Sequence, residues 1–287
     1  MESLCSWHSI SRQAHYQQRE RDKVQEGQAK MVLEKVQEKR QRHPRMGGRK
    51  LLHELQEWLR KAGLKIGRDR FFDLLRKAGL LVRPRRRFRR TTWPGEWRCE
   101  NLLPETVIKH PNQVWVSDIT YVDSEAGFGY LSQVTDAFSR FIVGYDFSTS
   151  LAVEGVLAAL NMAITRAGGE TAGLIHHSDH GIQYTCLAYG QELADHQILC
   201  SMGQKGNCYD NALAERVNGI LKQEYALGER FANIEQAARA VDEAIWLYNH
   251  ERPHLSLDYK KPYEIHYQHE NEVVLRDFFV NIFQDLT

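Results

Sequence analysis

The stretch QVWVSDITYV, residues 113–122, decides how the rest of the chain is interpreted. Its β-branched and aromatic residues are typical of a strand, and runs of the same texture follow at residues 128–138 and 140–148. Three strands so closely spaced predict an antiparallel meander. By alternation, Asp118 shares the apolar face of the first strand with Val114, Val116, Thr120 and Val122. A carboxylate in that position is costly unless it is paired or binds a metal ion.

Helical and strand-like segments alternate after the meander. Residues 151–168 and 186–197 have helical patterns, and residues 173–179 and 199–203 are short apolar runs. This alternation predicts an α/β layer fold with a mixed sheet. Asp179 ends the first of these runs, and α/β folds place their sites at the carboxyl ends of strands.

A long helix is expected from about residue 211 to 227, with Asp210 as its N-cap, and another near residues 235–249. Four apolar residues define one face of the first helix: Leu213, Val217, Ile220 and Leu221. A narrow polar stripe lies opposite, formed by Asn211, Glu215, Asn218 and Lys222. Taken alone, this stripe is equally well explained as an ordinary solvated face.

The charge of the chain is divided between its two parts. Residues 1–100 hold 26 basic and 12 acidic side chains, whereas residues 101–287 hold 12 and 25. This division suggests a polyanion-binding arm joined to an acidic body. No run approaches the length of a membrane span, and the start lacks a secretory pattern. Five scattered cysteines (Cys5, Cys99, Cys186, Cys200, Cys208) favour reduced thiols in a cytoplasm over a disulfide framework.

The basic arm is predicted to be largely helical. Residues 11–43 are polar and helix-prone, and two amphipathic segments at 49–59 and 68–81 flank a glycine-containing turn. This pattern describes a helix-turn-helix; the alternative is a helical hairpin that packs against the body. The surplus of Arg and Lys favours DNA binding. Residues 82–98 contain seven arginines and two prolines, which fits a solvated tether, a phosphate-neutralising one, or both.

Asp118, Asp179 and Glu215 are separated by 60 and then 35 intervening residues. This spacing resembles the acidic triad of the retroviral-integrase-like transposases, and more narrowly the OrfB-type transposases of insertion sequence family three. The likeness is carried by WVSDITYV, HHSDHGIQY and DNALAERVNGILKQE around the three acids, and by YNHERPHLSL and KKPYE downstream. HPRMGGRKLLHEL resembles the helix-turn-helix of that family, and SLCSWHSISRQAHYQQ resembles its amino end. The likeness therefore covers nearly the whole chain.

The resemblance implies a ribonuclease-H-like α/β core with a mixed five-stranded sheet, preceded by an all-α region. The three acids would bind two Mg²⁺ or Mn²⁺ ions that promote strand cleavage and transfer of a 3′-OH to a second phosphodiester. No covalent enzyme intermediate is needed, in keeping with the lack of a recognisable nucleophile–His–acid pattern. The implied regions are an N-terminal helical region (1–45), a helix-turn-helix (46–81), a basic linker (82–108), the catalytic core (109–270) and a tail (271–287).

Several residues are predicted to contact DNA. Lys222 matches the position in the family that contacts the transposon end, and the remaining candidates are Asn211, Gln183, Tyr184, Arg49, Lys50, Arg68, Arg70, Arg85, Arg86, Arg87, Arg89 and Arg90. His177 is expected to support the site from behind, and Asp123, Asp136 and Asp146 to be ordinary turn or surface acids.

Terminal inverted repeats and target DNA are the expected partners, bound by a homo-oligomer in the bacterial cytoplasm at the nucleoid. Members of the family usually work as a fusion with an upstream partner, OrfA. Three alternatives stay open: a ribonuclease-H-like nuclease that only hydrolyses, a DNA-binding regulator of transposition, and a structural scaffold.

Overall fold

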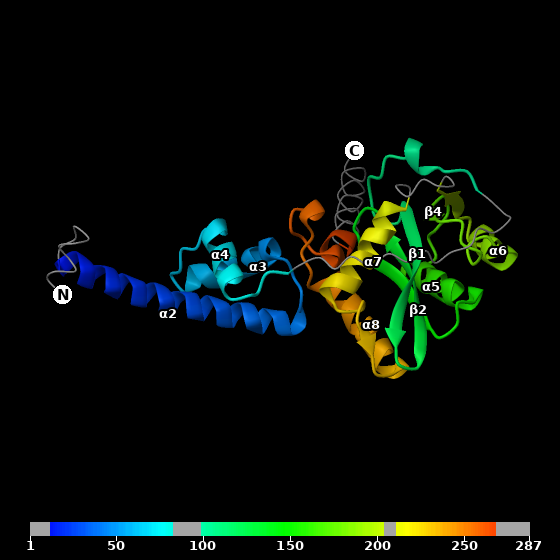
Figure 1. Ribbon diagram of the computed structural model, residues 1–287. Coiled ribbons are helices and arrows are strands. Elements are labelled where there is room, and N and C mark those ends of the chain that lie inside the picture. Colours follow the sequence, from blue (N-terminus) through cyan, green and yellow to red (C-terminus); the bar gives the residue numbers. More distant parts are fainter. Residues whose placement is uncertain (1–11, 83–98, 204–210, 268–287) are drawn as a thin grey trace, which may run out of the picture. The chain divides into compact units, whose positions relative to one another are not determined.

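The computed structural model describes residues 12–82, 99–203 and 211–267, which belong to two compact units, Met1–Arg83 and Pro84–Thr287 (Figure 1). Each unit has its own hydrophobic core. No helix in the described ranges is long and apolar enough to cross a membrane. The domain boundaries proposed from the sequence remain predictions.

The first unit consists of α2 (Arg12–Arg42), α3 (Gly48–Lys61) and α4 (Arg68–Lys77). Leu51, Leu55 and Leu59 of α3 recur at every fourth position and are buried, which confirms the apolar face predicted there. They pack with Val32, Val36, Met46, Leu64, Phe71 and Leu75. The two shorter helices therefore pack on the C-terminal half of α2, whereas residues 16–27 of α2 are exposed.

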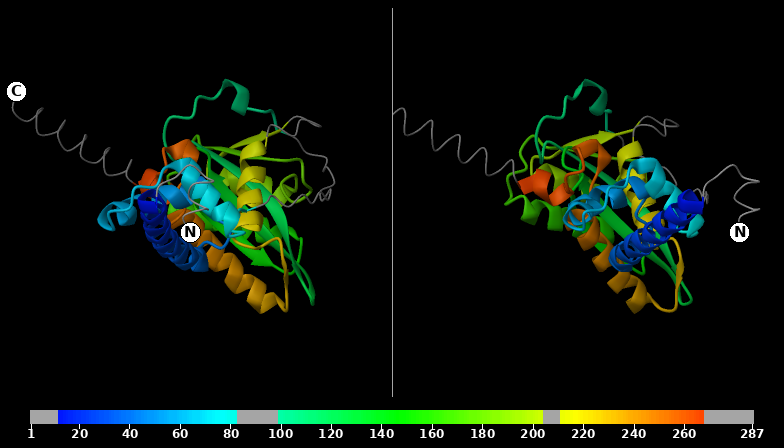
Figure 2. Two further views of the ribbon diagram at one scale, coloured as in Figure 1. Left: turned by 60° about the vertical axis from the view of Figure 1, so that its left-hand side comes forward. Right: turned by 90° about the vertical axis from the view of Figure 1, so that its left-hand side faces the viewer.

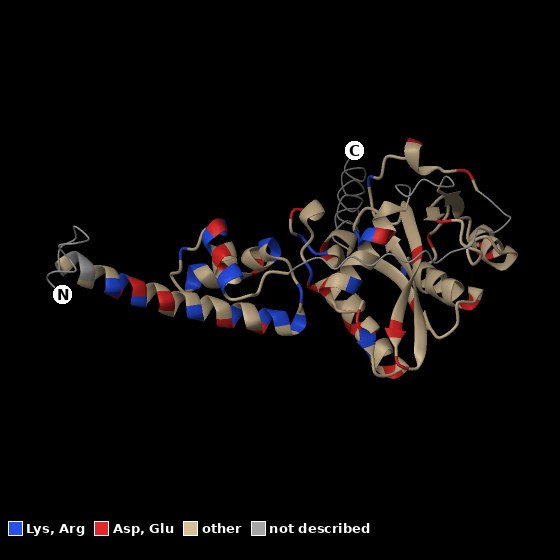
Figure 3. Ribbon diagram, in the orientation of Figure 1, with Lys and Arg blue, Asp and Glu red and all other residues tan. Residues whose placement is uncertain are grey.

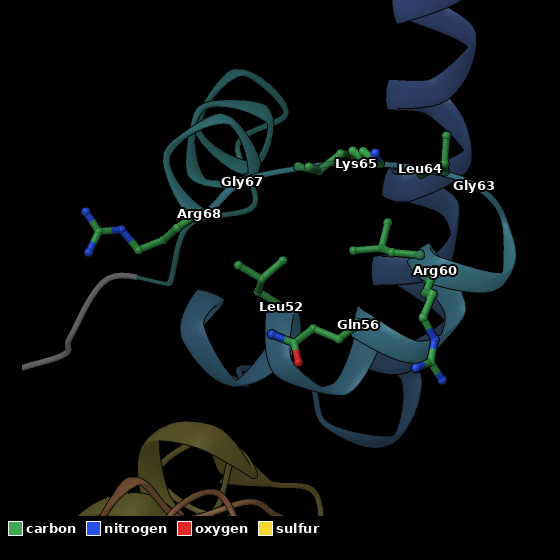
Figure 4. A pocket seen from close by; sticks show the side chains of 10 residues that line it. Leu52, Gln56, Arg60, Gly63, Leu64, Lys65, Gly67 and Arg68 are labelled. Atoms are coloured by element: carbon green, nitrogen blue, oxygen red, sulfur yellow. The ribbon is translucent and has the colours of Figure 1, made fainter.

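The turn between α3 and α4 begins at Gly63, whose φ of 68° is a left-handed conformation that favours glycine. A hollow lies in this elbow, lined by Leu52, Gln56, Leu59, Arg60, Gly63, Leu64, Lys65, Ile66, Gly67 and Arg68. The guanidinium groups of Arg60 and Arg68 extend away from it (Figure 4). The two short helices joined by a glycine-containing turn are present as predicted, and their assignment as a helix-turn-helix stays a prediction.

The second unit is built on a mixed sheet. Strands β1 (Val114–Ser124), β2 (Gly127–Asp136) and β3 (Ile142–Ser148) form the predicted antiparallel meander. Strands β4 (Ile175–Ser178) and β5 (Leu199–Met202) run parallel to β1, in the order β3-β2-β1-β4-β5. The prediction of a mixed five-stranded sheet in an α/β core is confirmed. A sixth strand of two residues, β6 (Arg230–Phe231), pairs with the far end of β1 and was not predicted.

Helices cover both faces of the sheet (Figures 1 and 2). Helices α5 (Val153–Arg166) and α6 (Leu187–Asp195) enclose one core with Trp115 and Ile119 of β1. Helices α7 (Ala212–Glu224) and α8 (Ile234–His250) enclose a second core with Val122. The odd and even residues of β1 thus face opposite layers, as alternation requires.

Two cysteines correct the expectation of reduced thiols. Cys99 and Cys200 form a disulfide with a Cα–Cα distance of 5.9 Å and a sequence separation of 101. The bond ties the segment just before η1 (Leu103–Glu105) to the edge strand β5. Among the described residues, Cys186 is a free cysteine, and Cys5 and Cys208 lie outside the described ranges.

Candidate active site

Asp118 is at the centre of β1 and lies on the face that α7 covers. Its Oδ2 accepts a hydrogen bond from Asn218 Nδ2 at 2.7 Å, and its Oδ1 accepts one from the backbone N–H of Ile119 at 2.9 Å. Alternation along β1 predicted this side correctly, because Val122, four residues on, packs into the core beneath α7 and α8. The carboxylate is therefore held on both oxygens and cannot rotate freely.

The sheet register brings Asp179 beside Asp118. Val116 of β1 is paired with His177 of β4 in parallel register. Extending that pairing by two residues places Asp179, which directly follows β4, next to Asp118 on the neighbouring strand. Asp179 Oδ1 accepts a hydrogen bond from the N–H of Gly181 at 2.9 Å. A Cβ on residue 181 would approach that same oxygen to 2.9 Å, so glycine keeps the turn close to the carboxylate.

The electrostatics of Asp118 bring the third acid into the same cluster. Burial raises the pKa of Asp118 to about 7, and the charge of Asp179 and, more weakly, that of Glu215 act in the same direction. The hydrogen bonds from Asn218 and Ile119 lower the same pKa. Asp179 and Glu215 therefore both lie within electrostatic reach of Asp118, although the three acids come from distant parts of the sequence.

Helix α7 carries Glu215 in its first turn. Asn211 is the N-cap residue, although its side chain makes no capping bond, so the expectation that Asp210 caps this helix is wrong. Asp210 itself lies outside the described residues. Glu215 is exposed, whereas Asn218, one turn later, is only 6% exposed and reaches Asp118. Glu215 therefore lies at the solvent-facing edge of the acidic cluster.

Two asparagines of the polar stripe of α7 face the sheet. Asn211 Nδ2 donates to the carbonyl oxygen of Ser117 at 3.1 Å, and both Asn211 and Asn218 are buried. Lys222 is half-buried; burial lowers its pKa, and the charge of Asp118 raises it. The interpretation of this stripe as a solvated face is therefore wrong for Asn211 and Asn218, which contact β1, whereas Glu215 of the same stripe is exposed.

Gln133, a residue that the sequence did not single out, orients the Asp118 carboxylate through Asn218. Gln133 of β2 is directly opposite Asp118 in the sheet register and is buried. Its Nε2 donates to Asn218 Oδ1 at 2.9 Å. Because the oxygen of Asn218 is occupied in this way, its nitrogen must face Asp118. The sequence could have indicated Gln133, because a polar residue in the middle of an otherwise apolar strand is unusual.

Two histidines of β4 are buried beside the site. His177 pairs with Val116 and so lies on the face of the sheet that carries Asp118, and its Nδ1 is 2.8 Å from Ser201 Oγ on β5. His176 Nε2 lies 2.7 Å from Ser117 Oγ and 2.9 Å from Tyr189 Oη. Burial lowers the pKa of His176 to about 3, so this imidazole is neutral at physiological pH.

Asp136 also differs from its prediction as an ordinary turn or surface acid. Asp136 is fully buried, where a surface acid was expected, and accepts hydrogen bonds from the N–H and Oγ of Ser139 and from the N–H of Asn112. His266 Nδ1 lies 2.9 Å from Ser139 Oγ, so a Ser–His–Asp cluster does exist. The hydroxyl of Ser139 donates its hydrogen bond to Asp136, so His266 does not accept it as a general base would. The three residues therefore stabilise the fold and do not form a catalytic triad.

The donor set around Asp118 suits a hard divalent cation. Carboxylates from two adjacent strands approach each other, and a cation would relieve their repulsion. Within the described part of the chain, the side-chain oxygens of Gln183 and Asn211 are buried and have no hydrogen-bond partner. No group of three His, Cys, Asp or Glu side chains there is close enough to chelate an ion. Glu215 therefore does not yet complete a ligand set with the two aspartates.

The residues predicted to contact DNA differ in how far their side chains are exposed. Arg49, Arg68 and Arg70 are exposed on α3 and α4, whereas Lys50 is buried. Gln183 and Tyr184 are buried, and Gln183 Nε2 donates to the carbonyl oxygen of Leu151 at 2.9 Å. Arginines 85–87, 89 and 90 lie outside the described residues. All of these contacts with DNA stay predictions.

Comparisons with known proteins agree with this geometry. The family described as Integrase core domain matches residues 108–208, and a second family of that description matches residues 196–262. The "Insertion element IS600 uncharacterized 31 kDa protein" of Shigella sonnei is 36% identical over 261 residues, which cover 88% of this chain and 94% of that protein.

Two further relatives are transposases by their descriptions. The "Putative transposase for insertion sequence element IS986/IS6110" of Mycobacterium tuberculosis (strain CDC 1551 / Oshkosh) is 36% identical over 202 residues, covering 68% of this chain and 73% of that protein. The "Transposase InsF for insertion sequence IS3A" of Escherichia coli (strain K12) is 35% identical over 164 residues, covering 56% of this chain and 57% of that protein.

Proposed function

The chain belongs to the transposases of insertion sequence family three, with an integrase-type catalytic core, and from this premise we propose that Asp118, Asp179 and Glu215 are its catalytic acids. The protein is a DNA transposase of the polynucleotidyl-transferase type. The observation that carries the assignment of the acids is the parallel register of β1 and β4, which aligns Asp118 with Asp179 under the polar stripe of α7.

An integrase core depends on divalent metal ions, and we assign two Mg²⁺ or Mn²⁺ ions to the three acids. Bound ions would stabilise the attacking and leaving oxygens of the phosphodiester during displacement. The carboxylate oxygens of Asp118, Asp179 and Glu215 would hold these ions. Glu215, exposed at the edge of the cluster, would have to turn toward the two aspartates when ions and DNA bind.

The other side chains of the site orient the Asp118 carboxylate or bind DNA. The N–H of Ile119 and the amide of Asn218 fix the Asp118 carboxylate, and Gln133 fixes Asn218 in turn. Lys222, beside Asp118, supplies an ammonium group for a phosphate of the transposon end. A free 3′-OH produced by cleavage would then attack a phosphodiester of the target.

DNA is the substrate, and we propose that the first unit binds the terminal inverted repeats. Residues 12–82 contain 19 Lys and Arg against 9 Asp and Glu, and the basic residues are distributed along α2, α3 and α4 (Figure 3). Exposed Arg49, Arg68 and Arg70 on the two shorter helices are the first contacts to test. We also propose that the chain acts as a homo-oligomer on paired ends, with an OrfA partner. Its proposed location is the nucleoid.

The acid assignment is tested by strand transfer with labelled DNA that carries the ends of the element encoding this chain. Asp118→Asn, Asp179→Asn and Glu215→Gln should each abolish joined products in Mg²⁺ while binding of the DNA persists. Asp123→Asn changes a carboxylate on the same strand outside the cluster and is the matched control. Near wild-type joining by any of the three variants would remove that residue from the catalytic set.

The same assay separates the alternatives. Cleaved but unjoined DNA from the wild-type chain would indicate a hydrolytic nuclease, and binding without cleavage a regulator. The charges of Asp179 and Glu215 both act on the buried Asp118, and this favours the transposase over both alternatives, because a regulator has no use for carboxylates that repel one another.

A further inference from the structure

The segment YNHERPH, residues 248–254, has no role in the site as described so far. It spans the C-terminal end of α8 and the turn after it. Tyr248, Asn249 and Arg252 are all buried, and Arg252 is only 2% exposed. Polar and charged groups at such depth need partners, and their partners show what the segment holds.

Asn249 fastens α8 to the sheet. Its Oδ1 accepts the backbone N–H of Ile142 at 2.9 Å, and its Nδ2 donates to the carbonyl oxygen of the same residue at 3.1 Å. Ile142 begins β3, which is an edge strand of the sheet. Its outward backbone groups have no neighbouring strand to pair with, and one asparagine side chain satisfies both.

Arg252 fastens the same segment to α7. Its Nε donates to Glu224 Oε2 at 2.9 Å and its Nη2 to Glu224 Oε1 at 3.0 Å, a bidentate ion pair. The guanidinium carbon also lies 5.7 Å from the ring centre of Tyr248. Glu224 is the last residue of α7, so the pair fixes the C-terminal end of the helix that carries Glu215.

These contacts form one mechanical connection between sheet and helix. At its start α7 is attached to β1 through Asn211, and at its middle through the Asn218–Asp118 hydrogen bond. At its end it is attached through Glu224 and Arg252 to α8, and from there through Asn249 to β3. Contacts at the start, middle and end of the helix oppose both its tilting and its sliding along the strand.

We propose that Arg252 is a positioning residue that sets α7 against the sheet, so that Glu215, Asn218 and Lys222 keep their places around Asp118. This inference rests on the proposed catalytic role of the acids. Asn218 is six residues before Glu224, about 9 Å along the helix, so a small rotation at the free end would displace its amide from the Asp118 carboxylate. Geometric errors of about 1 Å in a catalytic site cost on the order of 100-fold in rate.

The test uses the full chain with Arg252→Met, Arg252→Lys and Glu224→Gln. Tyr145→Phe is the matched control, because the hydrogen bond from Tyr145 Oη to Asp242 at 3.0 Å also joins β3 to α8 but does not involve α7. Three quantities are measured below the melting temperature of each variant: strand transfer, the Mn²⁺ concentration for half-saturation without DNA, and the NMR resonance of the Asn218 side-chain amide.

Arg252→Met should lower strand transfer about 10- to 100-fold, raise the half-saturating Mn²⁺ concentration and shift the Asn218 amide resonance. Glu224→Gln, which keeps the shape of the side chain, should do the same to a smaller extent, and Arg252→Lys should recover part of the loss. Tyr145→Phe should leave all three unchanged. A lowered melting temperature with unaltered Mn²⁺ binding, amide resonance and transfer would mean that the ion pair only stabilises the fold.

Failure of this inference is distinguishable from failure of the proposed function. If Asp118→Asn abolishes strand transfer while Arg252→Met and Glu224→Gln do not affect it, the positioning role alone is wrong. If Asp118→Asn leaves strand transfer intact, the catalytic assignment is wrong, and the positioning role falls with it.

Discussion

Replacing Asp118 by asparagine is expected to stabilise the metal-free protein at pH 8. The pKa of this carboxyl rises from 3.8 to about 7 in the folded chain, chiefly because of burial and secondly because of Asp179. The folded state therefore binds the proton more tightly than the unfolded chain does. Between about pH 4 and pH 7, unfolding releases that proton, so stability falls as the pH rises.

The size of the effect follows from the shift. Each pKa unit corresponds to about 1.4 kcal/mol, so a rise of roughly three units corresponds to at most about 4 kcal/mol above pH 7. Asparagine is neutral at every pH and avoids this cost, but it exchanges the charge-assisted bond from Asn218 for a weaker contact, a loss of about 1 kcal/mol. The Asp118 side chain is partly exposed, and solvent screening therefore reduces the cost of its charge. We expect the free energy of unfolding of the variant to exceed that of the wild type by about 2 kcal/mol at pH 8.

Chemical denaturation in EDTA at pH 4.5 and at pH 8 measures this difference. Wild type and Asp118→Asn should have similar free energies of unfolding at pH 4.5, and the variant should be the more stable at pH 8. Adding Mg²⁺ at pH 8 should raise the stability of the wild type more than that of the variant, since a ligand that binds only the folded state stabilises it. Equal or lower stability of the variant at pH 8 would refute the account of a strained acidic pair, and Asp123→Asn serves as the control.

Other consequences of the structure are open to test. Asn218→Ala should raise the pKa of Asp118 further and lower the free energy of unfolding at pH 8 by about 1–3 kcal/mol, measured by denaturation. Tyr184→Phe removes a buried hydroxyl that has no hydrogen-bond partner in the described part of the chain, so stability should be unchanged or higher. Tyr189→Phe removes a hydroxyl bonded to a histidine and should cost about 0.5–1.5 kcal/mol in the same assay. Charge reversal of the three arginines at 85–87 should weaken DNA binding of any sequence and reduce its salt slope by about one unit for each lost phosphate contact; an unchanged slope would show that they do not contact phosphate.

Local patterns were sufficient to predict the part of the fold that positions the site. Strict alternation along β1 determined which face Asp118 occupies, and β-branched texture predicted the meander and the two parallel strands. The spacing of the apolar residues of α7 placed Asn218 and Lys222 on the side of Glu215. These features depend on neighbours within a few residues of one another, which is the range in which periodicity is informative.

Contacts across long sequence separations could not be predicted in this way. The Gln133–Asn218 bond joins residues 85 positions apart, and the Cys99–Cys200 bond joins residues 101 apart. Nothing near Asp136 distinguishes a buried acid from a surface acid, because its burial depends on packing with His266. The polar stripe of α7 was ambiguous for the same reason: a stripe that contacts a strand and one that contacts water have the same period.

The central claim is that Asp118, Asp179 and Glu215 together hold the metal ions of a DNA transposase. Anomalous diffraction from crystals of the chain bound to a transposon end and soaked in Mn²⁺ tests it most directly. The account predicts peaks at about 2.0–2.3 Å from carboxylate oxygens of Asp118 and Asp179, with Glu215 turned in to complete the ligand set. Mn²⁺ bound elsewhere, with these three carboxylates free of metal, would contradict it.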